Sequence, residues 1–282
     1  MIPPPFRYAR AASLDEALQL LAEHGDEAKC LAGGHSLVPL MKLRLAAPSV
    51  LVDIGRLREL SYVREEGDRV AIGALSRHRD LEVSEILARQ VPILPYVAGL
   101  VGDPQVRHRG TIGGSIAHGD PASDLPAAIL ALEAELVLCS RRGRRVVAAI
   151  DFFRGFLETA LEPDEILVEI RVPKIGPNWS YQKFNQRAQD WAIVGAAVVL
   201  HGSPRIALVN MGGTPLRAPA AESALAGGAS ITAAAELAAE GTLPTSDGAA
   251  SAEFRRHLAR VLVRRGLEEA TAPGRVTTGR HP

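Results

Sequence analysis

A chain of 282 residues is too long for one ordinary hydrophobic core, so its length predicts two or three folding units. Hydrophobic residues make up 47% of the chain, which is ordinary for a globular protein. Lysine and arginine together number 32, as do aspartate and glutamate, so the overall charge argues against nucleic-acid binding. The basic run Arg141–Arg145 is expected to form a solvated hairpin turn.

The two cysteines, Cys30 and Cys139, form no Cys-x-x-Cys pair. This argues against an iron–sulfur cluster or a structural zinc site held by this chain alone. Two buried free thiols are the preferred interpretation, with a disulfide between them left open. The segment Met1–Pro5 contains no apolar signal core, and no stretch approaches the roughly 20 apolar residues of a membrane span. A cytoplasmic, reducing location is therefore the default expectation.

Residues 1–55 are expected to form a small β-α-β-like unit. Ser13–Glu16 is a capping box that opens a helix, and Gly25 ends it. Short strands are predicted at Lys29–Ala32 and Val50–Ile54.

Residues 56–175 are expected to form a second unit. A strand is predicted at Arg69–Ala74, a mostly helical region at Asp80–Leu100 with breaks at Pro92 and Pro95, and a helix start at Asp124. Three antiparallel strands are predicted at Leu136–Cys139, Arg145–Ala148 and Ile166–Val172.

Pro173–Pro177 is the predicted linker to a third unit, residues 178–282, in which a sheet is followed by helices. The predicted strands are Ser180–Phe184, Ala192–Leu200 and Arg205–Asn210, and the predicted helices are Ala218–Leu225, Thr232–Ala239 and Glu253–Leu267. The last helix is expected to use one apolar face, made by Phe254, Leu258, Val261, Leu262 and Arg265.

Two glycine pairs, in Ala32–Ser36 and Thr111–Ser115, are the main functional signal. Each is expected at a bend, where glycine lets several backbone N–H groups point at one spot. An anionic diphosphate needs such a cradle, so two of them predict a clamp on a dinucleotide. Neither the single-loop G-x-G-x-x-G fingerprint opening a helix nor a phosphate-binding G-x-x-x-x-G-K-[ST] motif is present.

The residues beside the glycine pairs add to this prediction. Ser36–Met41 resembles a helix start, and a helix N-terminus beside glycine amides favours an anion. Hydroxyl groups of Thr111 and Ser115 flank the second pair. Asp124 has two open interpretations, a helix N-cap or a carboxylate that accepts hydrogen bonds from ribose hydroxyls.

Three histidines, His35, His108 and His118, are too irregularly spaced to predict a metal site. No Ser-His-Asp or Cys-His arrangement has a recognisable local frame. Trp191 follows Asp190 at the head of an apolar strand, where a core or interface role is favoured over stacking on a flat cofactor ring.

The chain resembles the FAD-binding medium subunit of molybdenum hydroxylases, in the xanthine dehydrogenase family, and most closely the aerobic carbon monoxide dehydrogenase type. The resemblance rests on the two signature loops within Ala32–Lys42 and Thr111–Pro121. It extends over nearly the whole chain, through Met1–Pro4, Glu165–Ile170, Asp190–Ala192 and Glu253–Arg255. Two departures stand out: the family's basic, glycine-containing run is here Phe184–Gln189, and Ser115 replaces the more usual asparagine.

The resemblance implies an α+β fold of the vanillyl-alcohol-oxidase (PCMH) type. Two α+β FAD-binding subdomains, 1–55 and 56–175, would be followed by a C-terminal domain of a small sheet and helices, 178–282. The two loops would hold the FAD pyrophosphate through backbone amides. Asp124 matches an FAD-binding aspartate, and Trp191 matches an aromatic position beside the isoalloxazine, which raises its functional interpretation above the structural one.

The implied cofactor residues comprise both loops and single positions that line the adenine or flavin; no catalytic or metal-binding residue is implied. They are Lys29, Cys30, Leu31, Ala32, Gly33, Gly34, His35, Ser36, Val101, Thr111, Ile112, Gly113, Gly114, Ser115, Asp124, Leu167, Lys183 and Trp191.

The implied function is electron transfer within a heterohexameric complex. A molybdopterin-containing large subunit would hydroxylate the substrate, and a small subunit with two [2Fe-2S] clusters would relay electrons to FAD on this chain. The external acceptor would be quinone, NAD or oxygen, and the complex could lie at the inner face of the membrane. The alternative is a self-contained flavin oxidase of the same fold, with FAD attached covalently at His35.

Overall fold

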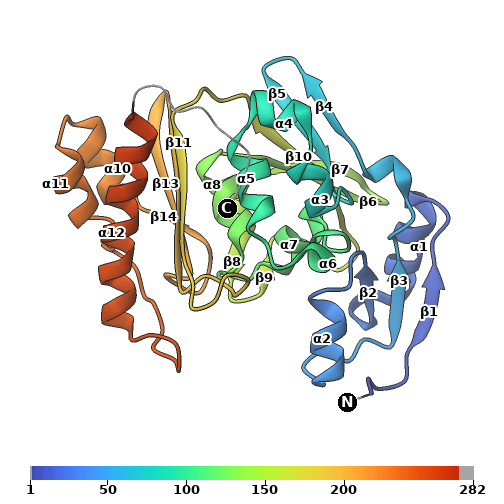
Figure 1. Ribbon diagram of the computed structural model, residues 1–282. Helices are drawn as coiled ribbons and strands as arrows, with labels where there is room; N and C mark the ends of the chain where they lie inside the picture. Colours follow the sequence, from blue (N-terminus) through green and yellow to red (C-terminus); the bar gives the residue numbers. More distant parts are fainter. Residues whose placement is uncertain (1, 273–282) are drawn as a thin grey trace.

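The structure is a computed structural model that describes residues 2–272. Three sheets follow one another along the chain, as Figure 1 shows from blue to red. The first has three strands, the second five and the third four. Within the described part of the chain, no helix combines the length and the apolar character needed to cross a membrane.

The N-terminal unit is a parallel sheet with strand order β1-β3-β2. Ser13 caps its first helix by accepting a hydrogen bond from the N–H of Glu16, at 3.2 Å, which confirms the N-cap of the predicted capping box. The Glu16 carboxylate accepts from the N–H of Ala12, at 2.7 Å, in place of the N–H of Ser13. The elements are β1 (Arg7–Arg10), α1 (Leu14–His24), β2 (Ala28–Leu31), α2 (Leu37–Lys42) and β3 (Val50–Asp53), with a 3-10 turn at Gly25–Glu27. The predicted β-α-β-like arrangement is confirmed.

The middle unit is an antiparallel sheet with strand order β4-β5-β10-β6-β7. Its strands are β4 (Val63–Glu66), β5 (Arg69–Gly73), β6 (Glu135–Ser140), β7 (Gly143–Ala148) and β10 (Ile166–Pro173). The helical segments are a 3-10 turn (Arg58–Leu60), α3 (His78–Glu82), α4 (Glu85–Gln90), α5 (Ile93–Gly99), α6 (Pro104–Arg107), α7 (Ile112–His118), α8 (Asp124–Ala131) and α9 (Ala149–Phe152). A small hairpin of β8 (Phe153–Gly155) and β9 (Glu158–Thr159) completes the unit.

The predicted helical region from Asp80 to Leu100 is three short helices. The predicted break at Pro92 is confirmed, because Pro92 stands immediately before α5. The predicted break at Pro95 is wrong: this proline lies in the first turn of α5, where a missing backbone N–H removes no intrahelical hydrogen bond.

The predicted hairpin turn at Arg141–Arg145 joins β6 to β7 and is mostly exposed. Two of its arginines are nevertheless paired. Arg142 binds Asp164 through two hydrogen bonds of 2.6 and 3.0 Å, and Arg145 lies 2.6 Å from the buried carboxylate of Glu165.

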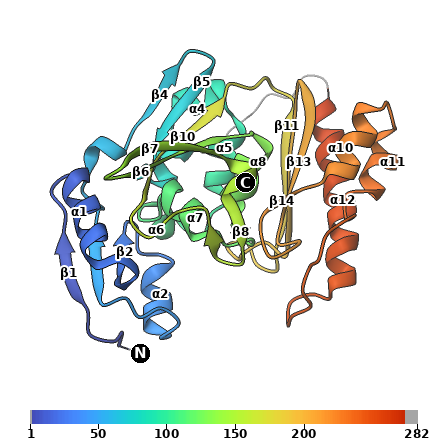
Figure 2. The same ribbon diagram turned by 180° about the vertical axis from the view of Figure 1, so that it is seen from behind.

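The C-terminal unit is a four-stranded antiparallel sheet covered on its outer face by helices (Figures 1 and 2). Its elements are β11 (Trp179–Phe184), β12 (Val194–His201), β13 (Ser203–Val209), β14 (Leu216–Arg217), α10 (Pro219–Ala226), α11 (Ile231–Glu236) and α12 (Ala252–Thr271). Helix α12 packs on β11 and β12, while α8 of the middle unit packs against β12 and β13. The third sheet is therefore buried between two layers of helices.

The buried face of α12 differs from the predicted one. Leu258 and Leu262 are buried as expected, but Phe254 is 42% exposed and Arg265 is exposed. Arg255 is buried instead, at 1% exposure. Its guanidinium donates to the carbonyl of Ile193 and to Asp247, at 2.6 Å for the latter. These partners replace part of the side chain's contact with water, while its Nε is buried without a hydrogen-bond partner in the described part of the chain.

Replacing Arg255 with alanine should lower the free energy of unfolding by about 2–4 kcal/mol, because it leaves a cavity and an unsatisfied carbonyl at Ile193. Urea denaturation followed by circular dichroism measures this change. The matched control is Arg264→Ala on the exposed side of the same helix, which should change stability by less than about 0.5 kcal/mol. Equal effects of the two substitutions would contradict a structural role for Arg255.

Candidate functional site

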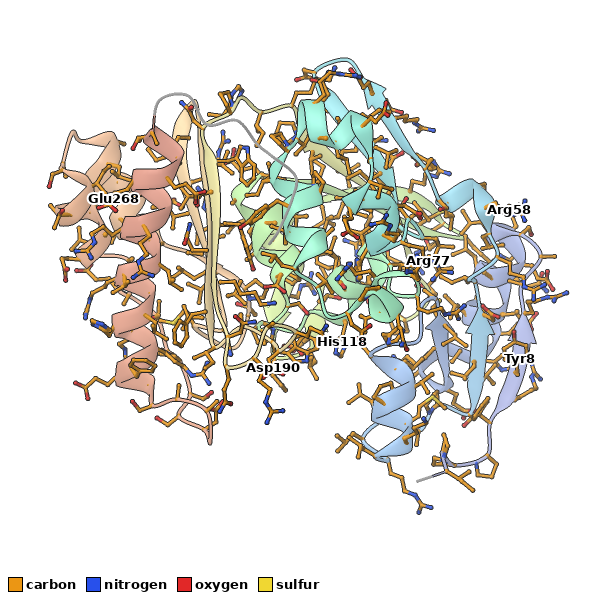
Figure 3. All side chains as sticks on the ribbon, viewed as in Figure 1. Tyr8, Arg58, Arg77, His118, Asp190 and Glu268 are labelled. Atoms are coloured by element: carbon orange, nitrogen blue, oxygen red, sulfur yellow. The ribbon has the colours of Figure 1, made fainter. Side chains whose placement is uncertain are left out.

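A cavity of about 710 Å³ lies where the three units meet. Its wall includes the loop after β2, the first turn of α7, part of β10, and the loop before β12. His118, from α7, and Asp190, from the loop before β12, both line this cavity and are labelled in Figure 3. A cavity of this volume can hold a ligand as large as a drug or a cofactor.

The first glycine pair forms the loop between β2 and α2, as predicted. Gly34 has φ +80°, a backbone conformation that L side chains rarely adopt. A Cβ on Gly33 would lie 2.3 Å from the carbonyl oxygen of Arg109, so the loop packs directly against another backbone segment. Among residues 2–272, the N–H groups of Gly33, Gly34 and His35 donate to no acceptor. This loop therefore has backbone donors left for an anion.

The second glycine pair does not form the predicted bend. Gly113 and Gly114 lie in the first turn of α7, whose N-cap is Thr111. The N–H of Gly113 donates to the carbonyl of Ala74 at 2.9 Å, and that of Gly114 donates to Thr111 Oγ1 at 3.1 Å. The neighbouring N–H groups of Ile112 and Ser115 also have backbone acceptors.

The amides of this second segment thus have acceptors within the chain itself. Its glycines serve close packing, since a Cβ on Gly113 would lie 2.5 Å from the Cβ of Ala74. Ser115 of this segment lines the cavity, and its hydroxyl lies 3.3 Å from His78 Nε2.

Asp124 is not a helix N-cap, because Ser123 occupies that position and Asp124 is the first residue of α8. Its carboxylate accepts hydrogen bonds from the Tyr181 hydroxyl at 2.6 Å and from Lys183 Nζ at 2.8 Å. Burial raises the pKa of Asp124, and Lys183 and Tyr181 partly offset this. The three side chains join the middle unit to the third sheet at the cavity wall.

Trp191 is 57% exposed and lines the cavity, in the loop between β11 and β12. The core role that its sequence context favours is wrong, because the side chain is exposed in this chain. Its ring is available to cover a flat ligand.

The cavity brings together most of the residues implied by the resemblance. Its lining includes Lys29, Cys30, Ala32, Gly33, Gly34, His35, Ser36, Val101, Thr111, Gly113, Gly114, Ser115, Asp124, Leu167, Lys183 and Trp191. Two implied residues do not line it. Ile112 is fully buried in the core, and Leu31 lines a second cavity on the other side of the loop.

Two residues of the site, Tyr181 and His78, were not identified from the sequence. Tyr181 lies two residues before Lys183 on β11, so both side chains point to the same face of the sheet. That spacing is a signal that could have found Tyr181. His78 lies on the cavity wall with 3% exposure, and no motif marks it.

Burial lowers the pKa of His78 to about 4, and the nearby His35 contributes in the same direction. The imidazole is therefore neutral at pH 7. Its Nε2 faces the Ser115 hydroxyl, while its Nδ1 is buried without a hydrogen-bond partner in the described part of the chain.

Cys30 and Cys139 are free thiols, and Cys30 is half-buried rather than fully buried. Over residues 2–272, no group of three or more His, Cys, Asp or Glu side chains could hold a metal ion. His35, His108 and His118 thus form no such group.

A loop with unpaired amides, a large cavity and an available aromatic ring define the class: a protein that binds a dinucleotide cofactor. Comparisons with known proteins make this specific. Residues 4–175 match the FAD binding domain in molybdopterin dehydrogenase, and residues 179–270 match the CO dehydrogenase flavoprotein C-terminal domain. The chain belongs to the family of FAD-binding medium subunits of molybdenum hydroxylases, and its cofactor is FAD.

Individual relatives match end to end. The carbon monoxide dehydrogenase medium chain of Hydrogenophaga pseudoflava is 45% identical, with 96% of this chain and 99% of the relative covered. A subunit of the 6-hydroxypseudooxynicotine dehydrogenase complex of Paenarthrobacter nicotinovorans is 38% identical, with 98% of each covered. A solved structure of carbon monoxide dehydrogenase from Hydrogenophaga pseudoflava superposes with a TM-score of 0.92 at 47% identity, covering 96% of this chain and 98% of that one. The implied family and fold are thereby confirmed.

Replacing Gly33 with alanine should weaken FAD binding at least tenfold, about 1.4 kcal/mol, because the new Cβ pushes the loop away from the backbone of Arg109. Titration of the flavin-free chain with FAD, followed by flavin fluorescence, measures the affinity. Gly213→Ala is the control, because a Cβ there meets nothing within 4 Å. Wild-type affinity in a folded Gly33→Ala chain would contradict the role of this loop.

His78 should make stability depend on pH between about 6.5 and about 4. The unfolded chain binds the proton more readily than the folded chain does. The contribution of neutral, buried His78 to the free energy of unfolding is therefore complete above pH 6.5 and is lost as the pH falls through this window. The loss amounts to at most about 3 kcal/mol. His78→Gln should flatten this part of the curve in urea denaturations at pH 7, 6 and 5. His201→Gln, at an exposed strand end, should leave it unchanged, and equal slopes in all three proteins would refute the assignment.

Proposed function

We propose that this chain carries FAD as the electron-transfer subunit of a molybdenum hydroxylase complex. A molybdopterin-containing large subunit would oxidise the substrate, and a small subunit with two [2Fe-2S] clusters would deliver the electrons. FAD, when bound, would supply the redox chemistry that passes them to an acceptor such as quinone, NAD or oxygen. The end-to-end match to a carbon monoxide dehydrogenase medium chain supports a complex of this kind.

The observation that carries the proposal is a cofactor cavity in a chain with two cysteines. Four thiolates hold each ordinary [2Fe-2S] cluster, so this chain cannot hold one by itself. Electrons that reach a flavin here must then come from another chain or directly from a substrate. The match to a named medium chain favours the first source.

The chain's own residues would bind and orient the cofactor. The N–H groups of Gly33, Gly34 and His35 would donate to the diphosphate, with Ser115 adding a hydroxyl. Asp124 would accept from a ribose hydroxyl while Tyr181 and Lys183 fix its orientation. Trp191 would lie beside the isoalloxazine and limit its contact with water.

The test is purification of the chain from its own host under native conditions, with a visible spectrum of what accompanies it. We expect two further polypeptides and a flavin spectrum overlaid with broad iron–sulfur absorption. The complex is expected in the cytoplasmic fraction or at the inner face of the membrane. A lone flavin-bearing chain that turns over a substrate with oxygen would refute the electron-transfer role.

The second candidate is a self-contained flavin oxidase with FAD attached covalently at His35. It is favoured by the position of His35, an exposed side chain at the cavity wall beside Gly34. Acid precipitation separates the two functions, because covalently attached flavin stays in the pellet and non-covalently bound FAD is released. Release of all the flavin would exclude attachment at His35.

A further inference from the structure

A second cavity, of about 510 Å³, lies on the opposite side of the Ala32–His35 loop from the FAD cavity. The two cavities share only this loop as a wall. The full lining is Leu31, Ala32, Gly33, Gly34, His35, Val38, Pro39, Lys42, Asp53, Gly55, Arg56, Arg77 and Arg109. Nothing in the function proposed above uses this space.

The charges around the second cavity are unbalanced. Lys42, Arg56, Arg77 and Arg109 line it, and none of them forms an ion pair within residues 2–272. Asp53 is the acidic residue of the lining. Its carboxylate accepts from the hydroxyl of Tyr8, and also from the N–H of Gly55 at 2.8 Å.

The half-buried Arg77 is held in place, which makes the positive charge a fixed feature. Its backbone N–H donates to Asp80 at 2.8 Å, and its guanidinium donates to the carbonyl of Arg109. Figure 3 places Arg77 between the helices of the middle unit and the N-terminal sheet. Burial and the charge of Arg109 lower the pKa of Arg77, and the nearby carboxylates of Asp80 and Asp53 act in the opposite direction.

Two other cations near the cofactor cavity do have carboxylate partners. Arg107, close to Arg109 in the sequence, lies 3.0 Å from Glu82, and Lys183 at the FAD cavity lies 2.8 Å from Asp124. Cations gathered around one cavity without such partners raise the local concentration of anions and hold them. Arginine forks fit the oxygens of phosphate groups better than they fit a single-point charge.

We propose that the second cavity is a binding site for a multivalent oxyanion of the phosphate class, with diphosphate the best match to its charge and volume. The site is separate from the FAD diphosphate site, since the Ala32–His35 loop stands between them. The guanidinium of Arg56 and the ammonium of Lys42 are exposed, so an anion reaches them from solvent.

The experiment titrates the full chain, saturated with FAD, with inorganic pyrophosphate in a calorimeter at constant ionic strength. Saturation with FAD occupies the first cavity, and the flavin spectrum reports any displacement. We expect saturable binding of one pyrophosphate per chain with an unchanged flavin spectrum. Parallel titrations with inorganic phosphate and with ADP distinguish a free oxyanion from the phosphates of a nucleotide.

Variants then locate the binding. Arg56→Gln and Lys42→Gln remove exposed charges that have no partner in the described structure, and each should weaken pyrophosphate binding at least tenfold. Arg264→Gln, an exposed arginine without an ion pair on α12, is the matched control and should bind as the wild type does. Because none of these side chains supports the described fold, circular dichroism should be unchanged in all three.

Three results would overturn the proposal. They are the absence of saturable binding in the FAD-loaded chain, release of FAD as pyrophosphate binds, and wild-type affinity in both Arg56→Gln and Lys42→Gln. Tighter binding of pyrophosphate than of ADP identifies a free oxyanion as the ligand. Equal or tighter binding of ADP that is also weakened by Arg56→Gln identifies a nucleotide phosphate at the same site.

Discussion

The cofactor site depends on backbone segments that approach each other without side chains between them. The Ala32–Ser36 loop rests on Arg109 and Gly110, where a Cβ on Gly33 would lie 2.3 Å from a carbonyl oxygen. Gly110 in turn lies against the ring of His78, and Gly113 lies against Ala74. Glycine is needed at these positions because even a methyl group would separate the layers. The loop of the N-terminal unit is thus positioned directly by the middle unit.

This arrangement explains why the two glycine pairs, so alike in sequence, play different parts. The first pair ends a strand, and its amides remain without acceptors in the described structure. The second begins a helix whose first-turn amides are already paired. In the described structure, the first pair thus has backbone donors without acceptors, whereas Gly113 of the second pair packs closely against Ala74. The cavity consequently exists only when both units are folded and in contact, so FAD binding must also stabilise that contact.

Most helices and strands of the fold could be predicted from the sequence, because they depend on local sequence patterns. Strands β6, β10 and β12 show long apolar runs, and Ser13 is an N-cap residue for α1. The predictions that were wrong concern features that depend on residues far away in the sequence. Two glycines have poor helix propensity, so a bend was the natural prediction at Gly113, yet tertiary packing placed them in a helix. Burial of Arg255 depends on Ile193 and Asp247, which no helical periodicity can reveal.

Composition has the same limit for the site. Equal numbers of acidic and basic residues predict no general attraction to nucleic acid, but a total says nothing about which charges have partners. Several arginines of the described chain are matched by nearby carboxylates, as Arg145 is by Glu165. Arg56, Arg77 and Arg109, which line the second cavity, have no such partner in the described structure. Because the Ala32–His35 loop lines both cavities, this local excess of positive charge lies close to both. A protein with no net charge would then hold anionic groups in both cavities that share this loop, because unpaired donors and cations gather there whatever the overall charge.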